Sequence, residues 1–515
     1  MKIILISPYS EIQSIGIRTL SACLKIEGYD VLLVFLPRNF MDRYEDKTLI
    51  EIVNISKGAD LIGVSVMTNY FDNVIQLTQR LKKDLTIPIL WGGIHATLRP
   101  AECLNYADMV CVGEGEEAVV ELVRKMRDGQ DYHDVQGIWF KDKNNIIKNK
   151  IRPLIQNLDS IPVQDYDYRD HYILDGKSIC KMDEGLLKKC INGTYITMPS
   201  RGCSFRCSYC CNNTLNKMYP NQKLVRKRSV DNIIKELADA KSKLPFIKRI
   251  MFDDDAFFIY TIEEIREFCE KYKYNIKLPL LIYGATPLTL TREKLSLLVD
   301  AGLTLIRIGI QTGSERTKRL YNRTYSNQQV EKVVNIINDF KDRIGQVQYD
   351  IILDNPWETD EDLIETLMFL SKLPTPYVLN LFSLTFFPET ELYRIAKRDG
   401  LLTNDSKDVY HKCYSICKKT YLNRLFFLIN DYVTRGWKIS PKMMSLLTSR
   451  KLKQLKLNWL LYIMLKTISI PWSVPYMVQR FYILLQKGLK DILAGDWFRI
   501  IRYIKRHKKQ FEMQK

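Results

Sequence analysis

The sequence predicts an α/β protein with two successive α/β domains and a helical C-terminal region. In residues 1–125 short apolar runs alternate with amphipathic stretches, and residues 196–410 repeat this alternation at least six times. Residues 411–515 show almost no strand pattern. Apolar runs that alternate with helices are typical of parallel sheets covered by helices. A chain of 515 residues is long enough for two or three domains, each with its own core.

Residues 1–150 are predicted to form a doubly wound parallel sheet. The expected strands are KIILISP, DVLLVFLP, LIGVSVM, PILWGG and MVCVG, and GIWFKDKNNIIKN is expected to close the domain as a hairpin. Ligands of such sheets bind beyond the carboxyl ends of the strands. Those ends are small or glycine-rich here, reading SPYS, SVMT, WGGIHAT and VGEGEE. They therefore indicate a ligand that approaches the backbone closely.

Residues 151–195 have weak periodicity and are predicted to be a linker. Residues 196–410 are predicted to form a partial (β/α)6 barrel whose strand ends face one mouth. Its expected helices include residues 261–273, 291–301, 326–340 and 359–371. The N-terminal apolar run is too short for a signal peptide, so a reducing, cytoplasmic compartment is expected.

The basic charge of the chain is confined to residues 411–515. This region has 22 Lys and Arg residues against 4 Asp and Glu residues, whereas residues 1–410 have 55 of each. One helical face over residues 450–466 is expected to carry Leu452, Leu455, Trp459, Tyr462 and Ile463. The longest apolar run, residues 459–465, is too short to span a bilayer. The region is predicted to be either a helical cap on the barrel or an element facing anionic lipid, with nucleic-acid binding less favoured.

Four cysteines, Cys203, Cys207, Cys210 and Cys211, lie in the segment PSRGCSFRCSYCCNN. Zinc sites favour two ligand pairs separated by a dozen or more residues, and no second pair follows nearby. Three thiolates in a short loop can instead hold three irons of a [4Fe–4S] cluster and leave the fourth iron open. Because adjacent side chains cannot easily face one small centre, Cys211 is expected to point elsewhere.

The spacing C-x3-C-x2-C after a strand, with Tyr209 before the last cysteine, resembles the radical S-adenosylmethionine (SAM) superfamily. The resemblance implies that Cys203, Cys207 and Cys210 bind the cluster and that Tyr209 lies near SAM. It also implies that the open iron binds SAM, whose reductive cleavage releases a 5′-deoxyadenosyl radical. An electron donor such as ferredoxin or flavodoxin is then required.

Later strands match other elements of this superfamily in order. MFDDDAFF resembles the place where a carboxylate meets the SAM amino group, which implies Asp253 and Asp254; an acidic turn is the alternative interpretation. RIGIQTGSERTKRLYNR is similar to the G-I-E-S-G-S-E signature with Gln311 in place of Glu, which implies that Gln311, Thr312 and Ser314 contact SAM. Asp354 and Glu389 stand where the superfamily commonly has glycine.

Residues 1–150 resemble the cobalamin-binding domain that precedes one class of these enzymes, mainly through PILWGGIHATLRPAECLNYADMVCVGEGEEAVVELV. The resemblance implies that Gly92 and Gly93 approach the corrin and that Ser65 and Thr68 meet its nucleotide tail. The D-x-H-x-x-G motif for a cobalt ligand is absent, and His95 lies on a different loop, so a structural role is expected for it. A second cluster, as in the methylthiotransferase group, is not favoured, because the cysteines of this domain are predicted to be buried: Cys23, Cys103 and Cys111.

Together these resemblances imply a radical SAM enzyme that abstracts hydrogen from an unactivated carbon, with cobalamin-dependent methyl transfer. One alternative keeps the radical chemistry without cobalamin and couples, cyclises or desaturates a lipid-like substrate. The other is a metal-stabilised binding protein whose basic region binds a membrane or nucleic acid. The basic, aromatic C-terminal region favours a lipid or membrane-bound substrate and a cytoplasmic protein at the membrane periphery.

Overall fold

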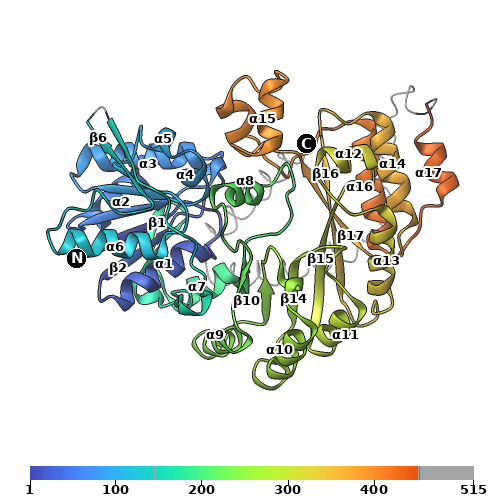
Figure 1. Ribbon diagram of the computed structural model, residues 1–515, viewed down its shortest axis with the longest axis horizontal. Helices are drawn as coiled ribbons and strands as arrows, with labels where there is room; N and C mark the ends of the chain where they lie inside the picture. The colour runs from blue at the N-terminus through green and yellow to red at the C-terminus, as the bar shows by residue number, and fades with distance from the viewer. Residues whose placement is uncertain (144, 451, 453–515) are drawn as a thin grey trace, which may run out of the picture. The chain divides into compact units, whose positions relative to one another are not determined.

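The computed structural model describes residues 1–143, 145–450 and 452 (Figure 1). It divides into two compact units, Met1–Lys418 and Lys419–Lys515. The described part of the second unit contains α16 (Tyr421–Thr434) and α17 (Pro441–Leu447). The apolar face expected over residues 450–466 lies outside the described residues, apart from Leu452. Among the residues that are described, no helix combines the length and apolarity that crossing a bilayer requires.

The first unit begins with a nine-stranded sheet of order β7-β6-β5-β4-β3-β1-β2-β8-β9. Its parallel central strands are β1 (Lys2–Ser7), β2 (Asp30–Phe35), β3 (Leu61–Ser65), β4 (Ile89–Gly92) and β5 (Met109–Cys111). Its helices are α1 (Ile15–Ile26), α2 (Asp46–Ser56), α3 (Phe71–Asp84), α4 (Ile94–Leu98), α5 (Pro100–Cys103) and α6 (Glu116–Arg127). The predicted hairpin is present as β6 (Ile138–Asp142) and β7 (Asn145–Lys148).

The segment predicted as a linker, residues 151–195, is more than a linker. It supplies β8 (His171–Asp175), which pairs in parallel with β2, and β9 (Ser178–Lys181), which pairs with β8. It also forms α7 (Glu184–Ile191) and the first strand residue of the second sheet, Thr194. The prediction was wrong because these strands are short and extend the sheet at one edge, so their sequences lack the apolar runs of the central strands.

The second sheet is a six-stranded parallel sheet, as predicted, in the order β10-β13-β14-β15-β16-β17. The strands are β10 (Thr194–Thr197), β13 (Arg249–Phe252), β14 (Leu280–Ala285), β15 (Leu303–Gln311), β16 (Gln346–Leu353) and β17 (Val378–Ser383). Helices follow the strands around the outside of this partial barrel (Figure 1): α9 (Val230–Lys243), α10 (Ile262–Asn275), α11 (Arg292–Asp300), α13 (Asn327–Asn338) and α14 (Asp360–Lys372).

Four of these helices begin and end within two residues of their predicted limits. Each has a hydroxyl residue at its N-cap that accepts a hydrogen bond from the first turn: Thr261, Thr291, Ser326 and Thr359. Such caps satisfy amide groups that the helix leaves unpaired, so the sequence marks where each helix starts.

The connection from β10 to α9 holds the cysteine loop. It contains a short antiparallel hairpin, β11 (Ser200–Arg201) with β12 (Arg226–Lys227), and between these strands α8 (Cys211–Met218). Three further short elements are α12 (Glu315–Leu320), α15 (Glu391–Arg398) and a π-helix at Ser406–Tyr410.

The strands of the barrel alternate between a buried outer face and a partly exposed inner face. In β15, Ile306, Ile308 and Ile310 are fully buried on the side of the helices, while Arg307 and Gln311 lie on the other side and are partly exposed. Since successive strand residues point to opposite faces, the polar residues of β15 face the barrel interior.

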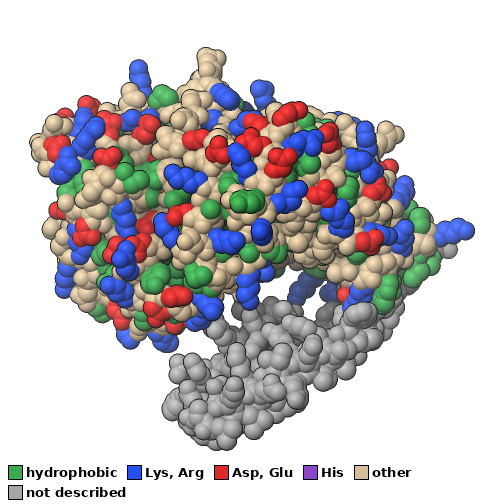
Figure 2. All heavy atoms as spheres, turned by 90° about the horizontal axis from the view of Figure 1, so that it is seen from below, with side chains coloured by type: hydrophobic (Ala, Val, Ile, Leu, Met, Phe, Trp, Pro, Cys, Tyr) green, Lys and Arg blue, Asp and Glu red, His purple; other side chains and the backbone are tan. Residues whose placement is uncertain are grey.

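Basic and acidic side chains are interspersed over the surface that Figure 2 presents. This mixture agrees with the equal numbers of basic and acidic residues in positions 1–410. Residues 1–410 therefore carry no net positive charge that would favour nucleic-acid binding.

Candidate functional site

The cysteine loop connects β11 to α8. Cys207 is buried, Cys203 and Cys210 are partly exposed, and Cys210 is the residue directly before α8. Among the described residues, no three His, Cys, Asp or Glu side chains converge as ligands of a single metal ion. The three thiolates of a cluster bind separate irons and therefore lie further apart than the ligands of one ion. Their role as cluster ligands stays a prediction.

Cys207 has a cationic neighbour that the sequence did not reveal. Arg323 Nη1 lies 3.3 Å from Cys207 Sγ, Nη2 donates to the Gly309 carbonyl at 2.6 Å, and Nε donates to Tyr325 Oη at 2.9 Å. These contacts fix the guanidinium beside the thiol. A positive charge there stabilises an anionic sulfur ligand. In the sequence Arg323 is only one of several basic residues after a helix, so no pattern identified it.

Cys211 was expected to point away from the cluster cysteines, but its thiol makes a hydrogen bond with the thiol of Cys210. A hydrogen bond between the two thiols raises the pKa of Cys210 well above its ordinary value, and burial adds to this effect. The same hydrogen bond lowers the pKa of Cys211. Tyr209 packs edge-on against Tyr321, with ring centroids 5.1 Å apart. Cys211 and Tyr209 therefore both lie at the cysteine loop.

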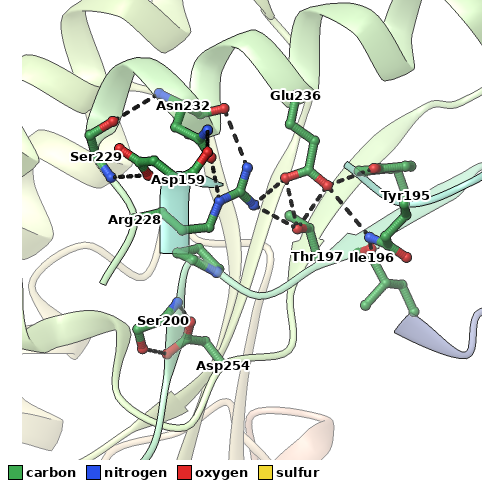
Figure 3. A network of polar contacts seen from close by, with 12 residues as sticks. Asp159, Tyr195, Ile196, Thr197, Ser200, Arg228, Ser229, Asn232, Glu236 and Asp254 are labelled. Carbon is green, nitrogen blue, oxygen red and sulfur yellow. Dashed lines mark hydrogen bonds and ion pairs between the residues drawn. The ribbon is translucent and has the colours of Figure 1, made fainter. Parts of the chain in front are cut away.

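The three consecutive aspartates after β13 have different environments. Asp254 accepts hydrogen bonds from Ser200 N and Oγ at 2.6 Å and from Ala256 N at 2.7 Å, and burial raises its pKa to about 6 (Figure 3). Its carboxylate is thus committed to the turn, which is the alternative interpretation of this motif. Asp253 is exposed; partial desolvation raises the pKa of its carboxyl, and the charge of Arg307 opposes this shift.

Asp255 is the aspartate that lies beside the cysteine loop. Burial raises its pKa, and a hydrogen bond with Asn212 in α8 opposes this shift. Its charge also acts on the thiols of Cys203, Cys210 and Cys211. Sequence analysis chose its two neighbours, because three adjacent carboxylates cannot be distinguished without the turn that Asp254 stabilises.

A buried polar network fixes the start of the barrel (Figure 3). Glu236 of α9 is 2% exposed and accepts hydrogen bonds from Tyr195 Oη at 2.7 Å and Thr197 Oγ1 at 3.0 Å. Its carboxylate also pairs with Arg228. The network ties α9 to β10, and Ser200 of the cysteine-loop hairpin follows β10 directly. A glutamate in a helix is normally exposed, so nothing in the sequence indicated that Glu236 is buried.

The polar residues at the end of β15 also divide into two groups. Thr312 and Ser314 are buried and bond to α14, through Thr312 Oγ1 with Thr366 Oγ1 at 3.1 Å and Ser314 Oγ with Asp362 Oδ1 at 2.6 Å. Gln311 has a φ of 68°, in the left-handed region, and its side-chain amide makes no hydrogen bond to a described residue. Of the three SAM contacts predicted at and after the end of β15, only Gln311 has a side chain without a hydrogen bond to a described residue.

The backbone conformation at Asp354 and Glu389 is one that favours glycine. Both residues have a φ of 63°, which glycine adopts without strain. A left-handed conformation costs other residues about 1–2 kcal/mol. The chain therefore keeps the left-handed backbone after β16 and before α15 while placing a carboxylate at each position.

A cavity of about 460 Å³ lies between the carboxyl ends of the first sheet and the cysteine-loop region. The first sheet contributes Ser65, Gly92 and Gly93 to its lining, and the barrel side contributes Asn212 and Asp255. The strand ends predicted to contact cobalamin therefore face the same space as Asp255, which lies beside the cysteine loop.

Thr68 does not line this cavity. Its hydroxyl is buried and lies 3.2 Å from His95 Nδ1. His95 is itself fully buried against the rings of Phe71 and Tyr410, and burial lowers its pKa to about 3. The structural role expected for His95 agrees with this position, whereas Thr68 is not brought to the predicted ligand.

The backbone of the cavity wall leaves no room for additional side-chain atoms at two glycines. Gly93 has a φ of 97°, and a Cβ atom there would lie 3.0 Å from the Val66 carbonyl oxygen. Gly113 also has a φ of 97°, and its Cβ would lie 2.3 Å from Tyr219 Oη. These clashes are with the protein, so the packing of the wall requires both glycines. Together with Gly92 and Gly115 they line the cavity without side chains, which fits a large flat ligand such as a corrin.

Ion pairs join the loop after β5 to the cysteine-loop hairpin. Arg226, which is 4% exposed, donates to both Glu114 oxygens at 2.9 Å and to the Ile155 carbonyl at 2.8 Å. Arg201 pairs with Glu114 at 3.2 Å and with Glu116 at 2.6 Å. These contacts hold the two sides of the cavity together.

Comparisons with known proteins match both halves of this arrangement. The radical SAM superfamily profile matches residues 197–370, and the B12 binding domain profile matches residues 1–123. An uncharacterized methyltransferase of Pyrococcus horikoshii is 26% identical over 70% of this chain and 74% of its own length. The bacteriochlorophyllide d C-8(2)-methyltransferase of Chlorobaculum tepidum is 23% identical over 74% of this chain and 78% of its own length.

The fold also matches a solved structure. The radical SAM methyltransferase TsrM of Kitasatospora setae, solved with tryptophan substrate and a SAM analogue, gives a TM-score of 0.61 at 17% identity. The match covers 77% of this chain and 76% of TsrM. This chain belongs to the radical SAM superfamily and carries a B12-binding domain before its barrel.

The family assignment confirms the cofactors expected from the sequence. Membership of the superfamily implies a [4Fe–4S] cluster and SAM, and the B12-binding domain implies cobalamin. Enzymes of this superfamily also need an electron donor.

Glu358, after β16, gives the site a measurable pH dependence. Burial raises the pKa of this carboxyl from 4.5 to about 7, and one of its oxygens has no hydrogen-bond partner among the described residues. The pKa of this carboxyl is 4.5 in the unfolded state and about 7 in the folded state. At a pH between these two values the folded state binds more protons than the unfolded state, so the free energy of unfolding falls as pH rises. We expect Glu358→Gln to remove a loss of about 3 kcal/mol between pH 5 and pH 8.

The measurement is chemical denaturation of the wild-type protein and the variant at both pH values. The matched control is Glu365→Gln, which changes an exposed glutamate of α14 and should keep the wild-type pH dependence. Equal pH dependence in the wild-type protein and Glu358→Gln would contradict the assignment.

Proposed function

We propose that this chain is a cobalamin-dependent radical SAM methyltransferase. The observation that carries the proposal is the shared cavity, because the wall that fits a corrin and Asp255 beside the cysteine loop line the same space. When bound, SAM supplies a radical that abstracts hydrogen from carbon, and cobalamin supplies a methyl group. The names of both curated relatives, which are methyltransferases, support this proposal.

Cys203, Cys207 and Cys210 are proposed to bind the cluster, with Arg323 stabilising the thiolate of Cys207. Gln311 and Tyr209 are proposed to contact SAM. Asp255 is the proposed partner of the SAM amino group, with Asp253 as a further candidate. Asp254 is left out, since its oxygens already accept three hydrogen bonds. Thr312 and Ser314 support the site by holding the end of β15 to α14.

Gly92, Gly93 and Ser65 are the proposed cobalamin contacts. Ser65 Oγ lies 2.7 Å from Tyr9 Oη, which orients its hydroxyl. Among the described residues that line the cavity there is no histidine. The described lining would therefore offer no histidine as a cobalt ligand, in agreement with the absence of the D-x-H-x-x-G motif from the sequence.

Ferredoxin or flavodoxin is the proposed electron donor. A second candidate function keeps the radical chemistry without methyl transfer, and it is favoured if no corrin binds. Binding of cobalamin thus separates the two functions.

Replacing single cysteines tests the cluster assignment. Alanine at Cys203, Cys207 or Cys210 removes one iron ligand, so we expect loss of most cluster iron and of 5′-deoxyadenosine formation. Cys211→Ala is the matched control and should keep the cluster. The measurements are iron and sulfide content after anaerobic reconstitution, electron paramagnetic resonance of the reduced protein, and chromatography of the product formed from SAM and dithionite.

Two outcomes would overturn this assignment. Loss of the cluster in Cys211→Ala would make Cys211 a ligand. A wild-type protein that holds the cluster and binds SAM but yields no 5′-deoxyadenosine, even with its substrate present, would remove the enzymatic proposal.

Filling the cavity tests cobalamin binding. Gly92 has an ordinary φ, and its Cβ position is 3.7 Å from the nearest atom, so Gly92→Leu extends a side chain into the cavity without backbone strain. We expect the variant to bind cobalamin at least tenfold more weakly and to keep its cluster content. Corrin absorbance after anaerobic purification with added cobalamin measures this. Gly185→Leu, on the exposed side of α7, is the control, and equal corrin content in both variants would contradict the proposed wall.

The basic C-terminal region is proposed to bring this cytoplasmic enzyme to anionic membranes. The supporting observation is the excess of 22 basic over 4 acidic residues in positions 411–515. We expect the full-length protein to float with phosphatidylglycerol-containing vesicles and to be released by 0.5 M salt, because surface electrostatics are screened at high salt. Vesicles of phosphatidylcholine alone are the control. Equal flotation with both vesicle types would contradict an electrostatic contact.

A further inference from the structure

The interior of the partial barrel contains an arginine whose terminal donors are free. Arg307 lies in the middle of β15 on the face opposite the buried Ile306 and Ile308, and its side chain is 26% exposed. A guanidinium that faces the interior of a barrel is costly to desolvate, so its partners decide what it can bind.

Asp350 orients this guanidinium through one nitrogen only. Arg307 Nε donates to Asp350 Oδ1 at 2.7 Å and Oδ2 at 3.0 Å. Asn380 Nδ2 holds the carboxylate in turn, at 2.9 Å from Asp350 Oδ1. No hydrogen bond joins Arg307 Nη1 or Nη2 to any residue that the structure describes. The end of the guanidinium that carries these two nitrogens is thus unpaired and fixed in direction.

Two aromatic rings flank the same guanidinium. Arg307 Cζ lies 5.0 Å from the ring centroid of Tyr283 in β14 and 5.4 Å from that of Phe382 in β17. Such cation–π contacts hold a guanidinium in place without using its N–H donors. Tyr414 packs against Phe382 at 5.9 Å, and its carbonyl accepts from Ser383 N at 2.7 Å, so residues after the π-helix support this ring.

The second arginine of the interior is occupied. Arg249 Nε donates to Thr194 Oγ1 at 2.6 Å, and its Nη2 donates to the Asn192 carbonyl at 3.4 Å. Both partners lie at the amino ends of the strands, away from the mouth. Asp253 follows the carboxyl end of β13, which β14 separates from β15, and its charge is within electrostatic reach of Arg307. Among the described residues, Arg307 is therefore a cation of the interior with unpaired terminal nitrogens, and Asp350 orients it.

We propose that Arg307 binds an oxyanion of the substrate, a carboxylate or a phosphate, through Nη1 and Nη2. Two parallel N–H donors match the two oxygens of such a group, which is the bidentate geometry that arginine favours. This inference rests on the proposed function, because it places the substrate in the barrel beneath SAM. It adds the chemical class of the substrate.

The position of Arg307 also sets a length for the substrate. Gln311, the proposed SAM contact, is four residues further along β15, which corresponds to roughly 13 Å at about 3.3 Å per residue. In a substrate whose anionic group is bound by Arg307, the carbon that lies at the mouth is therefore roughly 13 Å from that anionic group. The anionic group is thus a recognition group and is separate from the carbon that reacts.

Small aromatic probes test this site on the reconstituted holoenzyme. Benzoate and phenyl phosphate carry the two oxyanions on a ring that suits the aromatic flanks, and benzamide is the neutral equivalent of benzoate. Calorimetry without reductant measures binding in the absence of turnover. We expect at least one oxyanion probe to bind at least tenfold more tightly than benzamide. Benzoate alone indicates a carboxylate substrate, and phenyl phosphate alone a phosphate.

Variants assign the binding to Arg307. Arg307→Gln should weaken the oxyanion probe at least tenfold, and Arg307→Lys, which keeps the charge but not the paired donors, should give an intermediate loss. Arg249→Gln is the matched control and should bind as the wild-type protein does. Circular dichroism and iron content establish that each variant is folded and holds its cluster.

The inference is overturned if neither oxyanion binds the wild-type protein, or if Arg307→Gln and Arg307→Lys both bind like Arg249→Gln. A failure of the proposed function would appear elsewhere, as absence of 5′-deoxyadenosine or of corrin in the wild-type protein. Probe binding does not depend on either measurement.

Discussion

The buried pairing of Arg226 with Glu114 holds the two halves of the site at a fixed separation. Glu114 follows β5 of the first sheet, and Arg226 belongs to the hairpin that flanks the cysteine loop. Removing one partner of a buried pair leaves an uncompensated charge, which costs about 3–5 kcal/mol. The chain also satisfies this arginine with the Ile155 carbonyl. Chemistry that needs two cofactors in contact depends on this alignment, because small misplacements of reacting groups lower rates strongly.

Hydrogen-bond satisfaction separates the polar residues that build the strand ends from those that are free to bind a ligand. Asp254, Thr312 and Ser314 are buried with their oxygens engaged by protein donors or hydroxyls. Gln311 and Arg307 lie on β15, directly before Thr312, yet no described residue makes a hydrogen bond with the Gln311 side chain or with the terminal nitrogens of Arg307. A buried polar group without a partner costs free energy, so groups left free at a strand end are the ones that a ligand can satisfy.

Local signals predicted much of this structure, and non-local contacts account for what they missed. The helices of the barrel were predictable because hydroxyl caps such as Thr261 mark where they begin, and the cysteine spacing identified the loop. The edge strands β8 and β9 were not, because their pairing with β2 joins segments far apart in the chain. The choice between Asp254 and Asp255 depended on a turn that closes onto Ser200. Thr68 was predicted to meet the ligand, but its buried hydroxyl lies beside His95 and does not line the cavity.

The open barrel explains how the interior can hold polar groups at all. Closed eight-stranded barrels fill their centre with layers of branched apolar side chains, and their interior is a packed core. Here six strands leave the inner face partly exposed, so Arg307 and Asp350 keep 26% and 16% of their side-chain surface. The apolar core lies on the other face, where Ile306, Ile308 and Ile310 are buried toward the helices. The buried outer layer supplies the stability of the sheet. Residues of the inner face can therefore differ between members of the fold without loss of the sheet, and they can suit different substrates.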